Sequence, residues 1–200
     1  MIKRTICFFA AVAVIFSGAY VAHAALEQRA LSHKLIRLHV VANSDSEEDQ
    51  ALKLQVRDAV LAEVSGLTDG CDRVDVAKER LQQSLPVLEQ AAQRVVEQAG
   101  CSDNVTVSLQ QEVFPTRYYD TFTLPAGEYL SLRVSIGEGA GHNWWCVVFP
   151  SLCTAATAED WEEAAEVGRF SRSEEELISG GEEKYVLKFK VLEWLQNLLR

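Results

Sequence analysis

The sequence is short of basic residues. Its 200 residues include 19 Lys and Arg against 29 Asp and Glu, which gives a formal net charge of −10 at pH 7. A surface this acidic repels nucleic acid and anionic lipid headgroups, although a small local basic patch can still form. The chain also has no internal repeat at the spacing of a solenoid. These absences argue against a nucleic-acid partner and a repeat architecture, and they leave one domain with a real core.

Motifs that hold cofactors or metal ions are missing as well. The glycine-rich residues 137–141 lack the Gly-Lys-Ser/Thr ending of a phosphate-binding loop and precede a predicted strand instead of a helix. The acidic residues 43–49 lack the glycine and the spacing of a calcium-binding loop. No C-x2-C pair is present to suggest zinc. We therefore expect neither a cofactor nor a metal.

Only the N-terminus has a long apolar run. A basic start, Met-Ile-Lys-Arg, precedes the uncharged residues 6–21, and residues 22–24 (Ala-His-Ala) offer a small-residue cleavage site. This layout predicts a secretory signal peptide at residues 1–24. The alternative is an uncleaved anchor, because the apolar run reaches the lower length limit for crossing a bilayer. Either way, residues 25–200 are expected beyond a membrane, with 17 basic against 29 acidic residues and a formal net charge of −12.

Four cysteines follow the predicted signal peptide, an even number that allows disulfides in an exported protein. Cys146 and Cys153 bracket a single apolar run. Cys71 and Cys101 bracket a predicted helical segment. We expect these two pairings. The alternative is four buried free thiols, because cysteine packs as a small hydrophobe and a sequence does not show the separation of the Cα atoms.

A first helix is predicted after an acidic turn. Ser44 and Glu47 have the spacing of a capping box, and acidic residues fill the first turn. Apolar residues continue at helical spacing as far as Val64. Gly66 and Gly70 are expected to end this helix.

A second helix is predicted at residues 75–99, where Pro86 either kinks it or opens a separate helix. Elsewhere the pattern consists of short apolar runs or of alternation with a period of two, both typical of strands. Strands are predicted at residues 35–42, 105–110, 114–119, 130–136 and 144–149.

This order predicts an α+β domain in which helices pack on one face of a mostly antiparallel sheet. The domain is expected to span residues 25–153. Residues 154–183 are acidic, so we expect an exposed segment with at most a short helix at 161–167. Residues 184–200 return to helical spacing and predict a C-terminal amphipathic helix, which either packs on its own sheet or docks to a partner or a membrane.

Two adjacent tryptophans, Trp144 and Trp145, follow the glycine-rich turn at residues 137–141. Neighbouring side chains of a strand point to opposite faces, so one indole is expected in the core and the other outside. Tryptophan dominates binding hot spots, and an outward indole is therefore a candidate anchor for a partner.

A Cys/His arrangement gives a competing hypothesis. His142 lies four residues before Cys146, so an extracytoplasmic hydrolase using Cys146 or Cys153 is conceivable. However, the partners in such sites usually lie far apart in sequence, and a thiolate inside an apolar strand is costly. The simpler interpretation is that His142 and Asn143 are polar turn residues. We predict no catalytic residue.

Four segments carry a resemblance to a known family. They read HVVANSDSEEDQALK at residues 39–53, FPTRY at 114–118, LPAGEY at 124–129 and GEGAGHNWWC at 137–146. In this order they resemble the stage II sporulation protein R family, over about residues 35–153. Ser151 stands where the family pattern suggests a second proline, and residues 154–183 carry no motif of that family.

The resemblance implies a signalling role. Proteins of this family are made in the forespore and exported into the space between the forespore and mother-cell membranes. There they activate a membrane-embedded aspartic protease, stage II sporulation protein GA, which removes the pro-sequence from pro-sigma E. The resemblance implies a ligand with no catalytic residues, and any membrane contact is expected only through this partner or the C-terminal helix.

A contact surface for the protease follows from these expectations. We expect the hairpin at residues 137–146 and the strand at 114–119 to form it, with Trp144 or Trp145 as the anchor. The candidate contact residues are Phe114, Tyr118, His142, Asn143, Trp144 and Trp145.

Overall fold

The computed structural model describes residues 16, 18–19, 22–119, 122–152 and 158–179. The apolar run of the predicted signal peptide lies almost entirely outside these ranges, and so does the helix predicted at residues 184–200. No helix within the ranges combines the length and the apolar character that crossing a bilayer requires.

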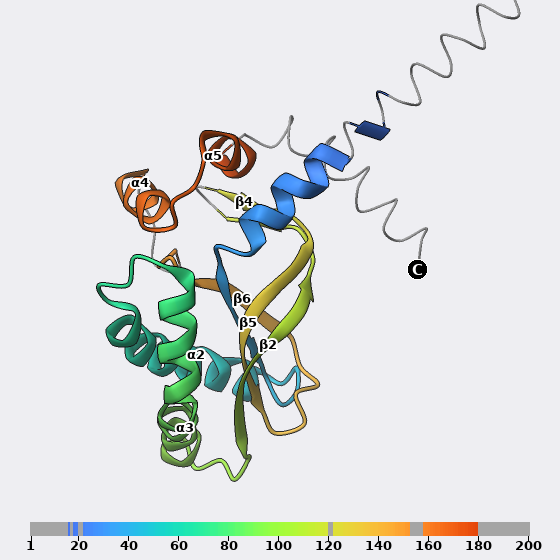
Figure 1. Ribbon diagram of the computed structural model, residues 1–200. Coiled ribbons are helices and arrows are strands. Elements are labelled where there is room, and N and C mark those ends of the chain that lie inside the picture. Colours follow the sequence, from blue (N-terminus) through green and yellow to red (C-terminus); the bar gives the residue numbers. More distant parts are fainter. Residues whose placement is uncertain (1–15, 17, 20–21, 120–121, 153–157, 180–200) are drawn as a thin grey trace, which may run out of the picture.

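Helices pack on a sheet that is mostly antiparallel, which confirms the predicted α+β class (Figure 1). A helix through residues 22–32 leads into the first strand. The later elements are β1 (Ile36–Val41), α2 (Glu47–Thr68), α3 (Val74–Gln98), β2 (Val105–Phe114), β3 (Arg117–Tyr118), β4 (Thr123–Leu124), β5 (Gly127–Ile136), β6 (Asn143–Phe149), α4 (Ala158–Val167) and α5 (Arg172–Ser179).

Four strands form a mixed sheet in the order β2-β5-β1-β6. The pairs β2–β5 and β1–β6 are antiparallel, as predicted, whereas the central pair β1–β5 is parallel. Parallel neighbours need a crossover connection, and α2, α3 and β2 all lie between β1 and β5 in the chain. Strands β3 and β4 form a separate two-stranded sheet.

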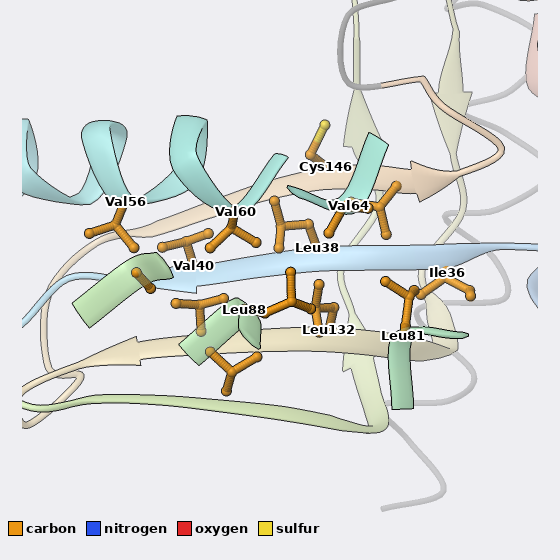
Figure 2. Close-up of a cluster of buried hydrophobic side chains, with 14 of the residues drawn as sticks. Ile36, Leu38, Val40, Val56, Val60, Val64, Leu81, Leu88, Leu132 and Cys146 are labelled. Atoms are coloured by element: carbon orange, nitrogen blue, oxygen red, sulfur yellow. The ribbon is translucent and has the colours of Figure 1, made fainter. Parts of the chain in front are cut away.

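Helices α2 and α3 cover one face of the sheet, as predicted (Figure 1). Figure 2 shows Val56 and Val60 of α2 directed toward β1, the strand that carries Leu38. It also shows Leu81 of α3 beside Leu132 of β5. All five side chains are buried, and each contributes about 1.5–3 kcal/mol through the removal of apolar surface from water. This layer holds β1 in the centre of the sheet.

The predicted start of α2 is wrong by two residues. Ser46, and not Ser44, is the N-cap, and its hydroxyl accepts a hydrogen bond from the backbone N–H of Asp49 at 3.1 Å. Ser44 instead donates to the carboxylate of Asp49 at 2.6 Å. The helix also continues through Gly66, because one glycine in a helix costs only about 1 kcal/mol relative to alanine.

Helix α3 is a single helix with Pro86 inside it. The sequence left open whether this proline begins a second helix, and the structure shows that it does not. Cys71 and Cys101 therefore stand beyond the two ends of one 25-residue helix.

A second apolar cluster lies on the face of the sheet that α2 and α3 do not cover. Phe114, Tyr129 and Val147 project from this face and are buried. Leu31, at the end of the helix through residues 22–32, packs with them, and so does Leu124 of β4. In Figure 1 this helix (blue) runs past the end of the sheet where β4 lies.

The structure describes residues 158–179 of the acidic segment 154–183, and these residues are more helical than predicted. The segment contains α4 and α5, and its residues Ala164, Phe170 and Ile178 are buried in the second cluster. The prediction of an exposed segment is therefore wrong for these residues. Ala164 of α4, Phe170 between the two helices and Ile178 of α5 are among the apolar side chains that meet the body of the domain.

Candidate functional site

The two tryptophans point to opposite faces of the sheet, as predicted. Trp144 pairs with Val40 of β1 and Trp145 pairs with His39. Trp144 stands at the rim of the helix-covered face, with the Arg57 guanidinium 4.3 Å from the centre of its ring. Trp144 as a whole is 36% exposed to solvent. Trp144 is therefore the more outward of the two indoles.

Trp145 is half-buried at the centre of an aromatic and cationic cluster on the other face. Its ring stacks on His39 with 3.7 Å between the ring centres, and Phe114 meets it edge-on at 4.7 Å. The Arg117 guanidinium lies 5.4 Å from the same ring. The Tyr119 hydroxyl donates to the backbone oxygen of Trp145 at 3.4 Å. The hairpin and the segment after β2 thus meet at Trp145.

His39 of β1 contacts residues of two other strands, β2 and β6, through its ring nitrogens. Nδ1 lies 3.2 Å from a carboxylate oxygen of Glu112 in β2, and Nε2 lies 2.8 Å from Oδ1 of Asn143 in β6. Arg133 of β5 donates to the other oxygen of Glu112 at 2.7 Å. Every member of this network is therefore held by a residue from a different strand.

Burial sets the charge states in this network. Loss of water lowers the pKa of His39 below its ordinary 6.5, which favours the neutral ring at pH 7. In the neutral ring the proton is on Nδ1, which donates to Glu112. Nε2 is then an acceptor, and the Asn143 amide can donate to it when the amide is turned by 180°. Burial opposes ionisation of Glu112, but the adjacent Ser131 hydroxyl and Arg133 guanidinium outweigh it and lower the pKa of that carboxyl.

Arg37 is the most unusual residue on this face, because its side chain is fully buried in the central strand. Its Nη2 donates to the Tyr119 hydroxyl at 2.7 Å. Its guanidinium carbon lies 4.2 Å from the ring centre of Phe114 and 5.1 Å from that of Tyr129. Burial lowers the pKa of Arg37, and it forms no ion pair with any residue that the structure describes. Cation–π contacts are its main compensation.

The glycine-rich turn docks on the loop before α2. The backbone N–H of Gly141 donates to Ala42 at 2.9 Å, and the N–H of Glu138 donates to the Asn43 side chain at 3.0 Å. A Cβ atom on Gly141 would lie 2.1 Å from the backbone oxygen of Ser44. The close approach therefore requires glycine at this position. The glycine-rich turn and the loop before α2 are far apart in the chain but pack closely together, and we call this contact the glycine corner.

Comparison with known proteins shows to which family this chain belongs. The profile described as stage II sporulation protein R matches residues 32–159, which include all the strands and both helices of the core. The chain belongs to the stage II sporulation protein R family. Stage II sporulation protein R of Bacillus subtilis (strain 168) is 30% identical over 226 residues, covering 98% of this chain and 99% of that protein. No solved structure matches. The protein is therefore a sporulation protein.

The predicted contact residues of this family member do not share one surface. Phe114 is fully buried, so it supports the site from beneath. Tyr118 is 53% exposed in the separate β3–β4 sheet, whereas Trp144 is exposed at the helix-covered face of the main sheet. The amide of Asn143 is engaged with His39. His142 is exposed and pairs with Asp45 in the loop before α2.

The predicted disulfide between Cys71 and Cys101 is wrong, because both are free thiols. Helix α3 separates them, and 25 helical residues span about 38 Å at 1.5 Å each, whereas bridged Cα atoms lie within about 7 Å. Cys146 is disulfide-bonded. Its predicted partner, Cys153, lies outside the described residues, so that pairing stays a prediction.

The Cys/His hypothesis loses one of its two possible nucleophiles. A disulfide leaves Cys146 with no thiolate, and its side chain packs in the core beneath α2 and α3. The His142 imidazole is directed to Asp45. Among the described residues, no three His, Cys, Asp or Glu side chains gather as a metal ion would require.

Sequence reasoning missed Arg37 and Glu112 as members of the site. One signal was present: Arg37 and His39 alternate with apolar residues inside a strand that was predicted to be buried. Two polar side chains two residues apart must share a face of the sheet, so that face had to contain partners for both. The partners themselves come from other strands, and the sequence does not show which ones.

Proposed function

We propose that this chain is an exported signalling protein that activates a membrane-embedded aspartic protease, stage II sporulation protein GA, and thereby starts the processing of pro-sigma E. Membership of the stage II sporulation protein R family carries this proposal. The signal-peptide layout of residues 1–24 supports export from the forespore into the space between the two membranes.

The protein acts in this proposal as a ligand and not as an enzyme. A ligand activates a protease only if it binds the competent state better than the idle state. The segments that carry the family resemblance meet in two places, the corner at Gly141 and the cluster around Trp145. Such rigid and preformed surfaces suit recognition, because little conformational entropy is lost when a partner binds.

Trp144 is the best candidate for the anchor of this contact. It is partly exposed and lies under Arg57, so its ring is held in place while one edge stays open to a partner. Trp145 is less suitable, because its ring is stacked between His39 and the neighbouring aromatic residues. Tryptophan and arginine together are typical of interface hot spots.

Co-production of the chain, the protease and pro-sigma E in a non-sporulating host tests the proposal. We expect processing of pro-sigma E only when the chain is present. Trp144→Ala is expected to reduce processing at least tenfold, which corresponds to a hot-spot loss of about 1.4 kcal/mol or more. Val87→Ala is the matched control, because Val87 is an exposed apolar residue on α3, remote from β6.

The comparison of these two variants tests whether Trp144 anchors the contact with the protease. Equal processing by the Trp144→Ala and Val87→Ala proteins, with equal amounts of exported chain, would remove Trp144 from the interface. Processing without the chain at all would refute the proposed function itself.

A further inference from the structure

The buried polar atoms that lack a hydrogen-bond partner are concentrated at one place. Among the described residues, five buried side-chain nitrogen and oxygen atoms have none. They are Nε and Nη1 of Arg37, Nε of Arg117, Nε1 of Trp145 and Oγ of Ser131. Four of the five are N–H donors, whereas the Ser131 hydroxyl already interacts with the adjacent Glu112 carboxylate, so the four N–H groups are the donors that need a partner. Buried polar groups in folded proteins are nearly always paired, so this concentration requires an explanation.

These residues form one continuous cluster on the face of the sheet opposite α2 and α3. Arg37 and Ser131 are direct neighbours on β1 and β5. Arg37 is joined through the Tyr119 hydroxyl to the backbone of Trp145, and Arg117 lies over the ring of Trp145. We define this set, Arg37, Arg117, Tyr119, Ser131 and Trp145, as the donor cluster.

The donor cluster contains two positive charges and no acid of its own. Among the described residues, Glu112 is an acidic neighbour of the cluster, and its carboxylate is already engaged by His39, Arg133 and the Ser131 hydroxyl. Arg37 and Arg117 lie close enough for each charge to oppose the other, which contributes to the lowered pKa of Arg37. An uncompensated buried cation costs several kcal/mol, so an acceptor with a negative charge would be strongly favoured here.

We propose that the donor cluster is a binding site for a carboxylate group. Charge-assisted bonds from arginine to a carboxylate are about twice as strong as neutral hydrogen bonds, and the indole N–H of Trp145 would complete the coordination. The aromatic rings of Phe114 and Tyr129 line the floor beside Arg37. A singly charged carboxylate loses less hydration energy in these surroundings than a phosphate with nearly two charges does.

The cluster reaches the surface on one side. Arg37 and Ser131 are fully buried, whereas Arg117, Tyr119 and Trp145 are half-buried. A carboxylate would therefore enter past Arg117 and Trp145, next to the short β3–β4 sheet. The protein as a whole is strongly acidic, so a donor site of this kind is a local exception that attracts an anionic group from outside.

The indole N–H of Trp145 and the Nε–H of Arg117 provide direct readouts. In the purified, nitrogen-15-labelled protein, both resonances are followed while sodium acetate is exchanged for sodium chloride at constant pH and ionic strength. We expect both resonances to move and to saturate with acetate. Arg117→Gln is expected to weaken acetate binding by about tenfold, since one charge-assisted bond is lost.

Matched controls distinguish the site from general anion effects. Arg73→Gln, on an exposed arginine at the start of α3, is expected to leave acetate binding unchanged. N-acetylglutamate α-amide and N-acetylalanine separate a side-chain carboxylate from a chain-terminal one, and the tighter ligand identifies the source. The proposal is overturned if acetate and chloride have the same effect, if Arg117→Gln binds acetate as the parent does, or if phosphate binds equally well.

Discussion

His39 illustrates at the residue scale how position decides the chemistry of a side chain. Its ring is buried against Trp145, and it touches Glu112 and Asn143. In the sequence, His39 alternates with the apolar residues Leu38 and Val40 of a predicted strand, a pattern typical of a partly buried side chain. The identity of its partners was not predictable, because they come from β2 and β6, which meet β1 only through the fold.

The lowered pKa of His39 predicts a specific dependence of stability on pH. In the unfolded chain this residue takes up a proton near pH 6.5, whereas in the folded protein it does so only at a lower pH. Between these two pKa values the unfolded chain binds more protons, so the free energy of unfolding falls as the pH falls below 6.5. The pKa of Glu112 lies below its ordinary 4.5, so its loss of charge occurs in a separate range.

Urea unfolding at pH 7.5 and pH 5.0 measures this effect. We expect the difference between the two free energies of unfolding to be larger for the parent protein than for His39→Gln, in which position 39 does not titrate. An equal difference in both proteins would show that His39 is not the group responsible.

The glycine corner shows at the element scale how a loop fixes the position of a helix. The turn after β5 donates backbone hydrogen bonds to the loop between β1 and α2, and Gly141 lies against the backbone of Ser44. The sequence indicated a glycine-rich hairpin and a capped helix, and both exist. It did not indicate that they touch, because that contact depends on the parallel pairing of β1 with β5.

Two glycine-to-alanine substitutions test this corner. Gly141→Ala is expected to lower the free energy of unfolding by about 1–3 kcal/mol, because the new methyl group meets backbone that cannot move aside. Gly66→Ala, inside α2 with no atom within 4 Å of the new Cβ, is expected to raise it by about 0.5–1 kcal/mol. Thermal or denaturant unfolding of the pair provides the measurement. Equal effects of the two substitutions would contradict the close packing at Gly141.

The whole molecule combines an accurately predicted framework with features that sequence patterns did not reveal. The helices over one face and the antiparallel pairs followed from periodicity. Helix α5 was not predicted and α4 was expected only as a short helix at residues 161–167, because an acidic composition obscured the few apolar residues, such as Phe170 and Ile178, that anchor them. The donor cluster was missed for a different reason: its members are unremarkable singly and become unusual only when the fold removes them from water.

The thiol content tests the cysteine assignment for the whole molecule. After residues 1–24 are removed, the chain holds four cysteines, of which Cys71 and Cys101 are free in the structure. Denaturation without reductant is therefore expected to expose two thiols per chain to a thiol reagent. A value near zero would restore the bridge between Cys71 and Cys101, and a value near four would show that Cys146 is reduced.

The dependence of signalling on export tests the central claim most directly. The measurement is the cleavage of pro-sigma E in a host with an oxidising cytoplasm, so that the disulfide of Cys146 can form on either side of the membrane. The full chain is compared with a chain that lacks residues 1–24 and stays inside the cell. The account predicts cleavage with the exported chain only. Equal cleavage with the retained chain would contradict it.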